Sequence, residues 1–261
     1  MKQENQVNES QKQRGNDMVI GRNAVTEAIK AGRSIDSIFV VKGERSGSLS
    51  AIISKAKQLG IPVKEVDGRK LDAMCFGGVH QGVAATVAVK DYAELEDIFE
   101  LAEKRGEPPF IIIADEIEDP HNLGALIRSA EAAGAHGIII PKRRAVGLTY
   151  AVGKASAGAI EYLPVVRVAN LSATVDDLKK RGIWVYAADM DGVSWCTADL
   201  KGAVALVVGG EDHGVGRLIK EKCDVILSLP MQGKVNSLNA SVAGAILMYE
   251  ITRQRLGIKA K

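Results

Sequence analysis

Residues 18–90 alternate between amphipathic stretches and short apolar runs, with glycines between them. Apolar residues at helical spacing predict helices over 23–32, 49–60 and 67–75, the last with Asp67 as its N-cap. Runs rich in β-branched residues predict strands over 34–41, 61–66 and 83–89. The pattern therefore predicts a small, compact α/β domain over 18–90.

The stretch 91–107 has a different character, with seven acidic residues against two basic ones. Apolar residues from Leu95 to Ala102 recur at helical spacing, which predicts a helix with one apolar face before the Pro-Pro break at 108–109. We expect this acidic helix to link two domains and to avoid a phosphate backbone.

From residue 108 to the end of the chain, apolar strands and amphipathic helices alternate. Such alternation is typical of an α/β sheet layered with helices. The expected strands cover 110–115, 137–141, 165–168, 183–189, 203–210 and 225–230. The expected helices cover 121–134, 150–159, 172–181, 216–223 and the stretch after Asn239. The sequence thus predicts a second α/β domain over 108–261.

Composition and charge add less than the pattern does. Residues 1–17 contain almost nothing apolar, so they cannot offset the entropy lost on ordering, and a disordered tail is expected. The formal net charge of +2 over 261 residues does not identify a nucleic-acid-binding protein. Residues 18–90, however, hold eleven Lys and Arg against six Asp and Glu. This local excess suits a phosphate backbone, although a solvated surface often carries a similar excess.

No apolar run approaches the ~20 residues that span a bilayer, and the polar N-terminus lacks the apolar core of a signal peptide. Cys75, Cys196 and Cys223 are widely separated and form no CxxC pair, so buried free thiols are expected. We therefore expect a cytoplasmic protein that makes no membrane contact.

Three stretches rich in small and polar residues, 119–134, 206–214 and 229–250, come at or directly after the ends of apolar strands. Ligands of α/β proteins bind beyond the carboxyl ends of the strands, so these stretches are predicted to meet at one site. In the last of them, Ser237 and Asn239 lie in a turn between a strand and a helix. Either they belong to the site or they serve only as helix caps. The small residues over 240–245 of that helix are expected to be exposed, where another backbone can approach closely.

Several other chemistries are disfavoured. A P-loop over 147–155 is rejected, because five residues separate its glycines and Ala155 stands where Ser or Thr is needed. No GxGxxG follows the first strand, and no HExxH occurs. No metal is expected, because the histidines lack metal-ligand spacing and suit capping or surface positions. These are His80, His121, His136 and His213.

In their order and spacing, DPHNLGALIRSAEAAG (119–134), LVVGGEDHG (206–214) and LPMQGKVNSLNASVA (229–243) resemble the three signature motifs of the SpoU (TrmH-type) RNA ribose 2′-O-methyltransferases. Residues 19–89, including GVHQGV at 78–83, resemble the RNA substrate-binding domain of the rRNA-modifying, RlmB-like branch. The resemblance implies a SPOUT-type α/β methyltransferase domain with a deep trefoil knot. It also implies S-adenosyl-L-methionine as cofactor and a homodimer with composite sites.

The resemblance also implies which residues form the site. Gly209, Leu229 and Leu238 would bind the cofactor, and we add Gly210 and Met231 because nearby backbone amides and apolar side chains can hold and enclose an adenine. The family's functional polar positions are occupied by Asn122, Arg128, Glu211, Ser237 and Asn239.

Asn122 and Arg128 lie six residues apart in one expected helix, which we interpret as roughly the same side, so that they can share a ligand. Glu211 is expected to orient one of the two. The resemblance puts Arg128 forward as the group that accepts the ribose proton. Because guanidinium groups are permanently charged in proteins, we expect Arg128 instead to orient the RNA phosphate and stabilise the developing alkoxide. The basic run 142–144 either grips RNA phosphates or forms a solvated loop.

We therefore expect an enzyme that methylates a ribose 2′-hydroxyl of RNA, most directly at a guanosine of 23S ribosomal RNA. One alternative is a tRNA methyltransferase of the same superfamily, which the N-terminal domain argues against. The other is a catalytically silent RNA-binding protein, which retention of the five polar residues argues against.

Overall fold

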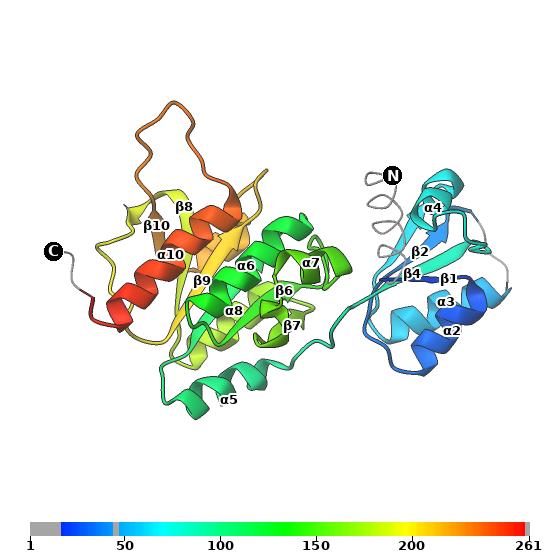
Figure 1. The fold of residues 1–261 in the computed structure, drawn as a ribbon, viewed down its shortest axis with the longest axis horizontal. Coiled ribbons are helices and arrows are strands. Elements are labelled where there is room, and N and C mark those ends of the chain that lie inside the picture. Colours follow the sequence, from blue (N-terminus) through cyan, green and yellow to red (C-terminus); the bar gives the residue numbers. More distant parts are fainter. Residues whose placement is uncertain (1–16, 44–46, 259–261) are drawn as a thin grey trace, which may run out of the picture. The chain divides into compact units, whose positions relative to one another are not determined.

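The structure, a computed structural model, describes residues 17–43 and 47–258. Residue contacts form two compact units (Figure 1). The first extends to Asp91 and includes Gly147–Gly153, and the second comprises Tyr92–Val146 and the chain from Lys154 onward. The expected tail, 1–17, lies outside the described residues except for Asp17, which is buried.

The first unit is a four-stranded sheet in the order β1-β4-β2-β3, with β2 and β3 parallel and the other pairs antiparallel. Its strands are β1 (Met18–Ile20), β2 (Ile35–Val41), β3 (Val63–Val66) and β4 (Val83–Val87). Its helices are α2 (Arg22–Lys30), α3 (Gly47–Gln58) and α4 (Gly68–Met74). Asp67 caps α4 as expected, accepting a hydrogen bond from the Lys70 amide at 2.8 Å. Strand β1 was not predicted, because three residues are too few to show a period.

The second unit is a six-stranded parallel sheet in the order β10-β8-β9-β5-β6-β7. Its strands are β5 (Phe110–Asp115), β6 (Gly137–Pro141), β7 (Val165–Val168), β8 (Trp184–Ser194), β9 (Val204–Gly209) and β10 (Val225–Ser228). Its helices are α5 (Leu95–Arg105), α6 (Pro120–Ala132), α8 (Leu171–Lys180), α9 (Arg217–Lys222) and α10 (Ala240–Arg255), with the 3-10 helix η2 (Ala159–Glu161). Helix α7 (Tyr150–Ala155) begins in the segment grouped with the first unit. The predicted α/β architecture is confirmed, and all strand pairs of this sheet are parallel.

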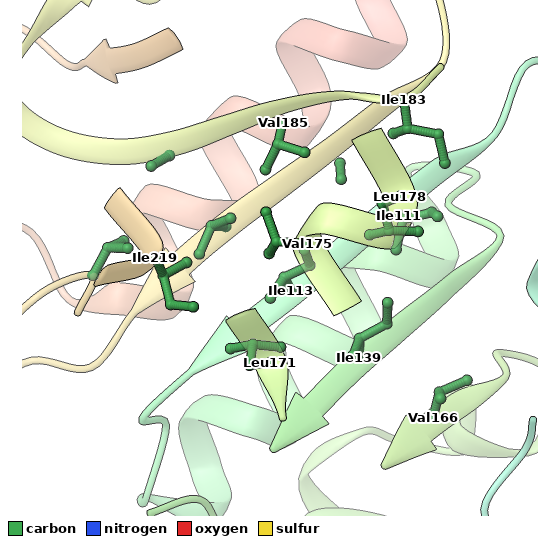
Figure 2. Close-up of a cluster of buried hydrophobic side chains, with 14 of the residues drawn as sticks. Ile111, Ile113, Ile139, Val166, Leu171, Val175, Leu178, Ile183, Val185 and Ile219 are labelled. Atoms are coloured by element: carbon green, nitrogen blue, oxygen red, sulfur yellow. The ribbon is translucent and has the colours of Figure 1, made fainter. Parts of the chain in front are cut away.

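One face of this sheet is covered by α5, α8 and α9, whose side chains join a single apolar cluster with β5, β6 and β8 (Figure 2). Ile111 and Ile113 point into it, and their neighbours Phe110 and Ile112 are equally buried. Helices α6 and α10 lie side by side (Figure 1), α10 in contact with β9 and α6 with β6. Both faces of β5 are therefore buried, which explains its continuous apolar run.

Helix α5 forms where the sequence predicts it, but it does not stand apart as a linker. The Ile98 side chain is fully buried in the apolar cluster of the second unit. The acidic residues lie mostly on its outer side, where Glu96 pairs with Arg181 at 2.8 Å. The apolar face of α5 thus makes it part of the second unit.

Helix α10 presents its two faces differently from the expected pattern. Its small residues face inward, since a side chain at Gly244 would meet Leu126 at 2.8 Å. Leu247 and Met248 are fully buried beside it. Val242, Ile246 and Tyr249, a stripe at helical spacing, are instead exposed. The close packing that we expected on the outside is used within the chain, and the outward stripe consists of larger apolar side chains.

Candidate active site

A cavity of about 400 Å³ opens at the carboxyl ends of β9 and β10 in the second unit. All five expected cofactor residues, Gly209, Gly210, Leu229, Met231 and Leu238, line it. Its other walls include Val208 and Leu247, which are buried and apolar. The volume falls in the range of roughly 300–1,000 Å³ that is typical of small-molecule sites.

Glycine is required at two positions of this cavity. A Cβ on Gly209 would lie 2.0 Å from the Gly214 carbonyl carbon, and one on Gly210 would lie 2.6 Å from the Glu116 oxygen. The Gly214 amide donates to the Gly210 oxygen at 2.9 Å and closes the turn between them. The backbone therefore folds back tightly after β9, and its peptide groups rather than side chains form this wall of the cavity.

An irregularity in β8 forms another wall. Ile226 of β10 pairs with Ala187, and the next residue, Leu227, pairs with Val193, so residues 188–192 bulge out of the sheet. This bulge brings Asp189 and Met190 into the cavity. Burial alone would raise the pKa of Asp189, but hydrogen bonds from Lys220 and from nearby amides hold that pKa below its usual value. The cavity thus contains an ionised carboxylate that was not predicted, because the pattern of a strand gives no sign of a bulge.

Three of the expected polar residues form one hydrogen-bonded cluster. Asn122 donates its amide to Glu211 Oε1 at 3.0 Å, and Asn239 donates to Asn122 Oδ1 at 2.8 Å and also to Glu211 Oε1. The Asn239 Oδ1 atom meanwhile caps α10, accepting from the Ser241 and Val242 amides at 3.0 and 3.2 Å. Asn239 therefore serves as both cap and site residue, because its amide has two ends.

The other two polar candidates lie outside this cluster. Ser237 lines the 400 Å³ cavity and is exposed. Arg128 is exposed on α6 and lines neither cavity described here, and its side chain makes no hydrogen bond or ion pair within residues 17–43 and 47–258. Six helical residues turn through ~600°, which is ~120° short of two full turns. Asn122 is buried and Arg128 points elsewhere, so the expectation of a shared side was wrong.

A second cavity, of about 560 Å³, adjoins the first. Both share the turn 210–214, including Glu211 and His213. Asn122 lines the second cavity together with Arg144 and several carboxylates. The carboxylates are Glu116, Glu118, Asp119, Glu211 and Asp212. Sequence reasoning treated His213 as a capping or surface residue, since a lone histidine carries no spacing signal.

Within the described residues no group of three or more His, Cys, Asp or Glu side chains is arranged to hold a metal ion. No helix among them is long and apolar enough to cross a membrane. The three cysteines are free, and Cys196 is exposed, contrary to the expectation that all are buried.

Comparison with known proteins decides the family. Residues 109–249 match the SpoU rRNA Methylase family, and residues 18–93 match the domain described as RNA 2'-O ribose methyltransferase substrate binding. The chain belongs to the SpoU rRNA methylase family. It is therefore an RNA ribose methyltransferase, in a family that uses S-adenosylmethionine.

Relatives of this SpoU methylase span nearly its whole length. YacO of Bacillus subtilis (strain 168), assigned to the TrmH family of tRNA/rRNA methyltransferases, is 51% identical over 240 residues, covering 92% of this chain and 96% of YacO. The AdoMet-bound rRNA methyltransferase from Sinorhizobium meliloti has 25% identity and a TM-score of 0.57, covering 92% of this chain and 87% of that one. AviRb from Streptomyces viridochromogenes, solved with AdoMet, shares the fold at 24% identity and a TM-score of 0.58, covering 92% and 90%.

Proposed function

We propose that this SpoU methylase transfers a methyl group from S-adenosylmethionine to the ribose 2′-hydroxyl of a guanosine in 23S ribosomal RNA, acting in the cytoplasm as a homodimer. One observation carries the proposal. A small-molecule cavity with a backbone wall adjoins a polar cavity, and Glu211, which accepts hydrogen bonds from Asn122 and Asn239, lines both. Methyl transfer needs two such compartments, one for the donor and one for the acceptor.

The first cavity fits the cofactor. Backbone groups at Gly209 and Gly210 suit the edges of an adenine, and Leu229, Met231 and Leu238 can enclose the ring. The ionised carboxylate of Asp189 can accept hydrogen bonds from the cofactor's ribose hydroxyls or from its ammonium group. When bound, the cofactor supplies an electrophilic methyl group on its sulfonium.

The polar cluster is suited to hold the acceptor hydroxyl. Glu211 Oε1 already accepts from two amides, which fixes the carboxylate and leaves its second oxygen available. That oxygen can accept a hydrogen bond from the ribose 2′-hydroxyl and align an oxygen lone pair with the methyl group. Asn122 is buried, so the alignment is rigid on the enzyme's side.

The position of Arg128 supports the proposed homodimer. Arg128 points outward from α6, and the neighbouring α10 exposes the apolar stripe Val242, Ile246 and Tyr249. An isologous interface over these helices would bury the stripe and bring Arg128 to the partner's site. There a charged guanidinium would stabilise the developing alkoxide. The new O–CH3 bond forms as the S–CH3 bond of the cofactor breaks and leaves a thioether, and the hydroxyl proton passes to water.

The test measures transfer of a radiolabelled methyl group from S-adenosylmethionine to unmodified transcripts of 23S ribosomal RNA and of tRNA. The labelled RNA is then digested and its nucleosides identified. We expect label in 2′-O-methylguanosine from 23S ribosomal RNA. Label in tRNA alone would favour the tRNA alternative, and no label in either RNA would favour a silent RNA-binding protein.

A further inference from the structure

Two non-glycine residues at the second cavity adopt left-handed backbone conformations, Glu116 with φ 57° and Arg144 with φ 55°. Residues with a Cβ rarely adopt this conformation, so the surrounding structure must hold them in place. Glu116 directly follows β5, and Arg144 follows β6, its parallel neighbour. Their side chains form an ion pair, Arg144 Nη1 to Glu116 Oε1, at 2.6 Å.

The turns that carry this pair are fixed to each other and to the wall shared by the two cavities. The Val146 amide donates to the Ile117 oxygen at 2.9 Å, which joins the turn after β6 to the turn after β5. The backbone carbonyl oxygen of Glu116 lies close to Gly210, since a Cβ on Gly210 would be 2.6 Å from that oxygen. The position of Arg144 is therefore set relative to the Asn122–Glu211 cluster.

Arg144 is also electrically distinct. Of the residues that line the second cavity within the described part of the chain, it is the only Lys or Arg, against five Asp and Glu. Those carboxylates repel phosphate, so an RNA strand can enter only with a nucleoside pointing inward and its phosphates at the rim. The Arg144 side chain is 75% exposed, so it is accessible at that rim, whereas Glu116 is 22% exposed.

We propose that Arg144 binds the phosphate next to the target nucleotide and positions the ribose for methyl transfer, with Glu116 holding the guanidinium in place. The ion pair with Glu116 uses Nη1, which leaves the other N–H groups of the planar fork free to donate to phosphate oxygens. Arg144 is thus a positioning residue of the reaction under "Proposed function", on which this inference rests. It also divides the basic run 142–144, since neither Lys142 nor Arg143 lines the cavity.

The test measures binding of the 23S ribosomal RNA transcript to the full-length protein at several KCl concentrations. For Arg144→Ala we expect Kd for RNA to rise about tenfold and the slope of log Kd against log salt to fall by about 1, because one phosphate contact is lost. The affinity for S-adenosylmethionine should stay unchanged. Arg144→Lys keeps the charge and should keep the slope while lowering kcat/KM, because lysine lacks the fork.

Two further variants separate a phosphate contact from a structural ion pair. Glu116→Gln breaks the same pair but retains the charge of Arg144, so it should keep the wild-type slope while lowering kcat/KM, because the guanidinium is no longer held in place. The matched control is Arg181→Ala, which removes an arginine that also pairs with a glutamate, Glu96. Arg181 lies just before β8 and hence at the amino ends of the strands, opposite the cavities, so this variant should also keep the wild-type slope. An unchanged slope in Arg144→Ala, an equal fall in Glu116→Gln, or loss of cofactor binding in Arg144→Ala would overturn the proposal. Wild-type protein that binds the transcript without methylating it would contradict the proposed function instead, and the slopes would still decide the role of Arg144.

Discussion

The two cavities of the second unit share one wall but are built from different parts of the chain. The first is formed by a glycine turn, a bulge and buried apolar side chains, with Asp189 as a fixed charge. The second is lined mostly by charged side chains on the turns after β5 and β9. Backbone walls cannot adapt without refolding, whereas exposed side chains can. Under the proposed function, this difference predicts that cofactor binding is preorganised by the fold and that RNA selection depends on individual side chains.

The strongest test of this difference is Gly209→Ala, for which we expect affinity for S-adenosylmethionine to fall ~100-fold or more. The added Cβ would collide with backbone at 2.0 Å, so the turn itself must move. Calorimetric titration with the cofactor measures the change. Gly202→Ala is the matched control, because nothing lies within 4 Å of its Cβ position. Normal binding by Gly209→Ala would show that the turn is not rigid.

Glu211→Gln tests the shared wall at nearly constant shape. Removing the charge weakens the acceptor of the two amides and of the ribose hydroxyl, so we expect kcat to fall ~100-fold while the cofactor Kd changes only slightly. Single-turnover methylation of the RNA transcript measures the rate. Asp212→Asn, which alters the neighbouring carboxylate in the same two cavities, should cost far less. Equal losses would mean that general charge, not the cluster, drives the effect.

Asp189→Asn tests the one fixed charge that the β8 bulge brings into the first cavity. We expect the cofactor Kd to rise ~10-fold, the usual scale for one charge-assisted hydrogen bond, with RNA affinity unchanged. The same calorimetric titration gives the value. Asp191→Asn serves as control, since Asp191 belongs to the bulge but does not line the cavity. If both variants bind alike, Asp189 does not touch the cofactor.

The smallest effect concerns a group remote from both cavities. Burial lowers the pKa of His136, nearby Arg105 and Arg255 lower it further, and Glu107 opposes them. As the pH falls, His136 therefore binds a proton in the unfolded chain before it does so in the folded protein. The free energy of unfolding then decreases below pH ~6.5, by at most ~1.4 kcal/mol per pH unit. Urea unfolding at pH 7.5 and pH 5.5 measures this loss. His136→Asn should be less stable but less pH-dependent, and an identical pH dependence would assign the effect to other groups.

Much of the fold follows from the sequence, because apolar residues recur at the regular spacing of helices and strands. In β5, β6 and β9 the apolar runs are continuous, as strands covered on both faces require, and glycines or capping residues mark many of the helix ends. The three motifs were placed at strand ends, and parallel strands bring those ends to one edge. Gly209, Gly210, Leu229, Met231 and Leu238 therefore meet in one cavity, as expected. The trefoil knot, the homodimer and the assigned roles stay predictions.

Only the tertiary structure decided what depends on contacts between distant segments. The bulge in β8 that places Asp189 arises because β8 pairs with β10. The paired residues Tyr186 and Val225 are 39 positions apart in the sequence, so no local pattern encodes the bulge. The sequence allowed Glu211 to pair with either Asn122 or Arg128. The rotation of α6 about its axis turns Asn122 toward Glu211, and the two side chains form a hydrogen bond. Arg144, unlike its neighbour Arg143, lines the second cavity and pairs with Glu116 on another turn. Sequence fixes periodicity and the order of elements, whereas the direction of a charged side chain is set by what packs beside it.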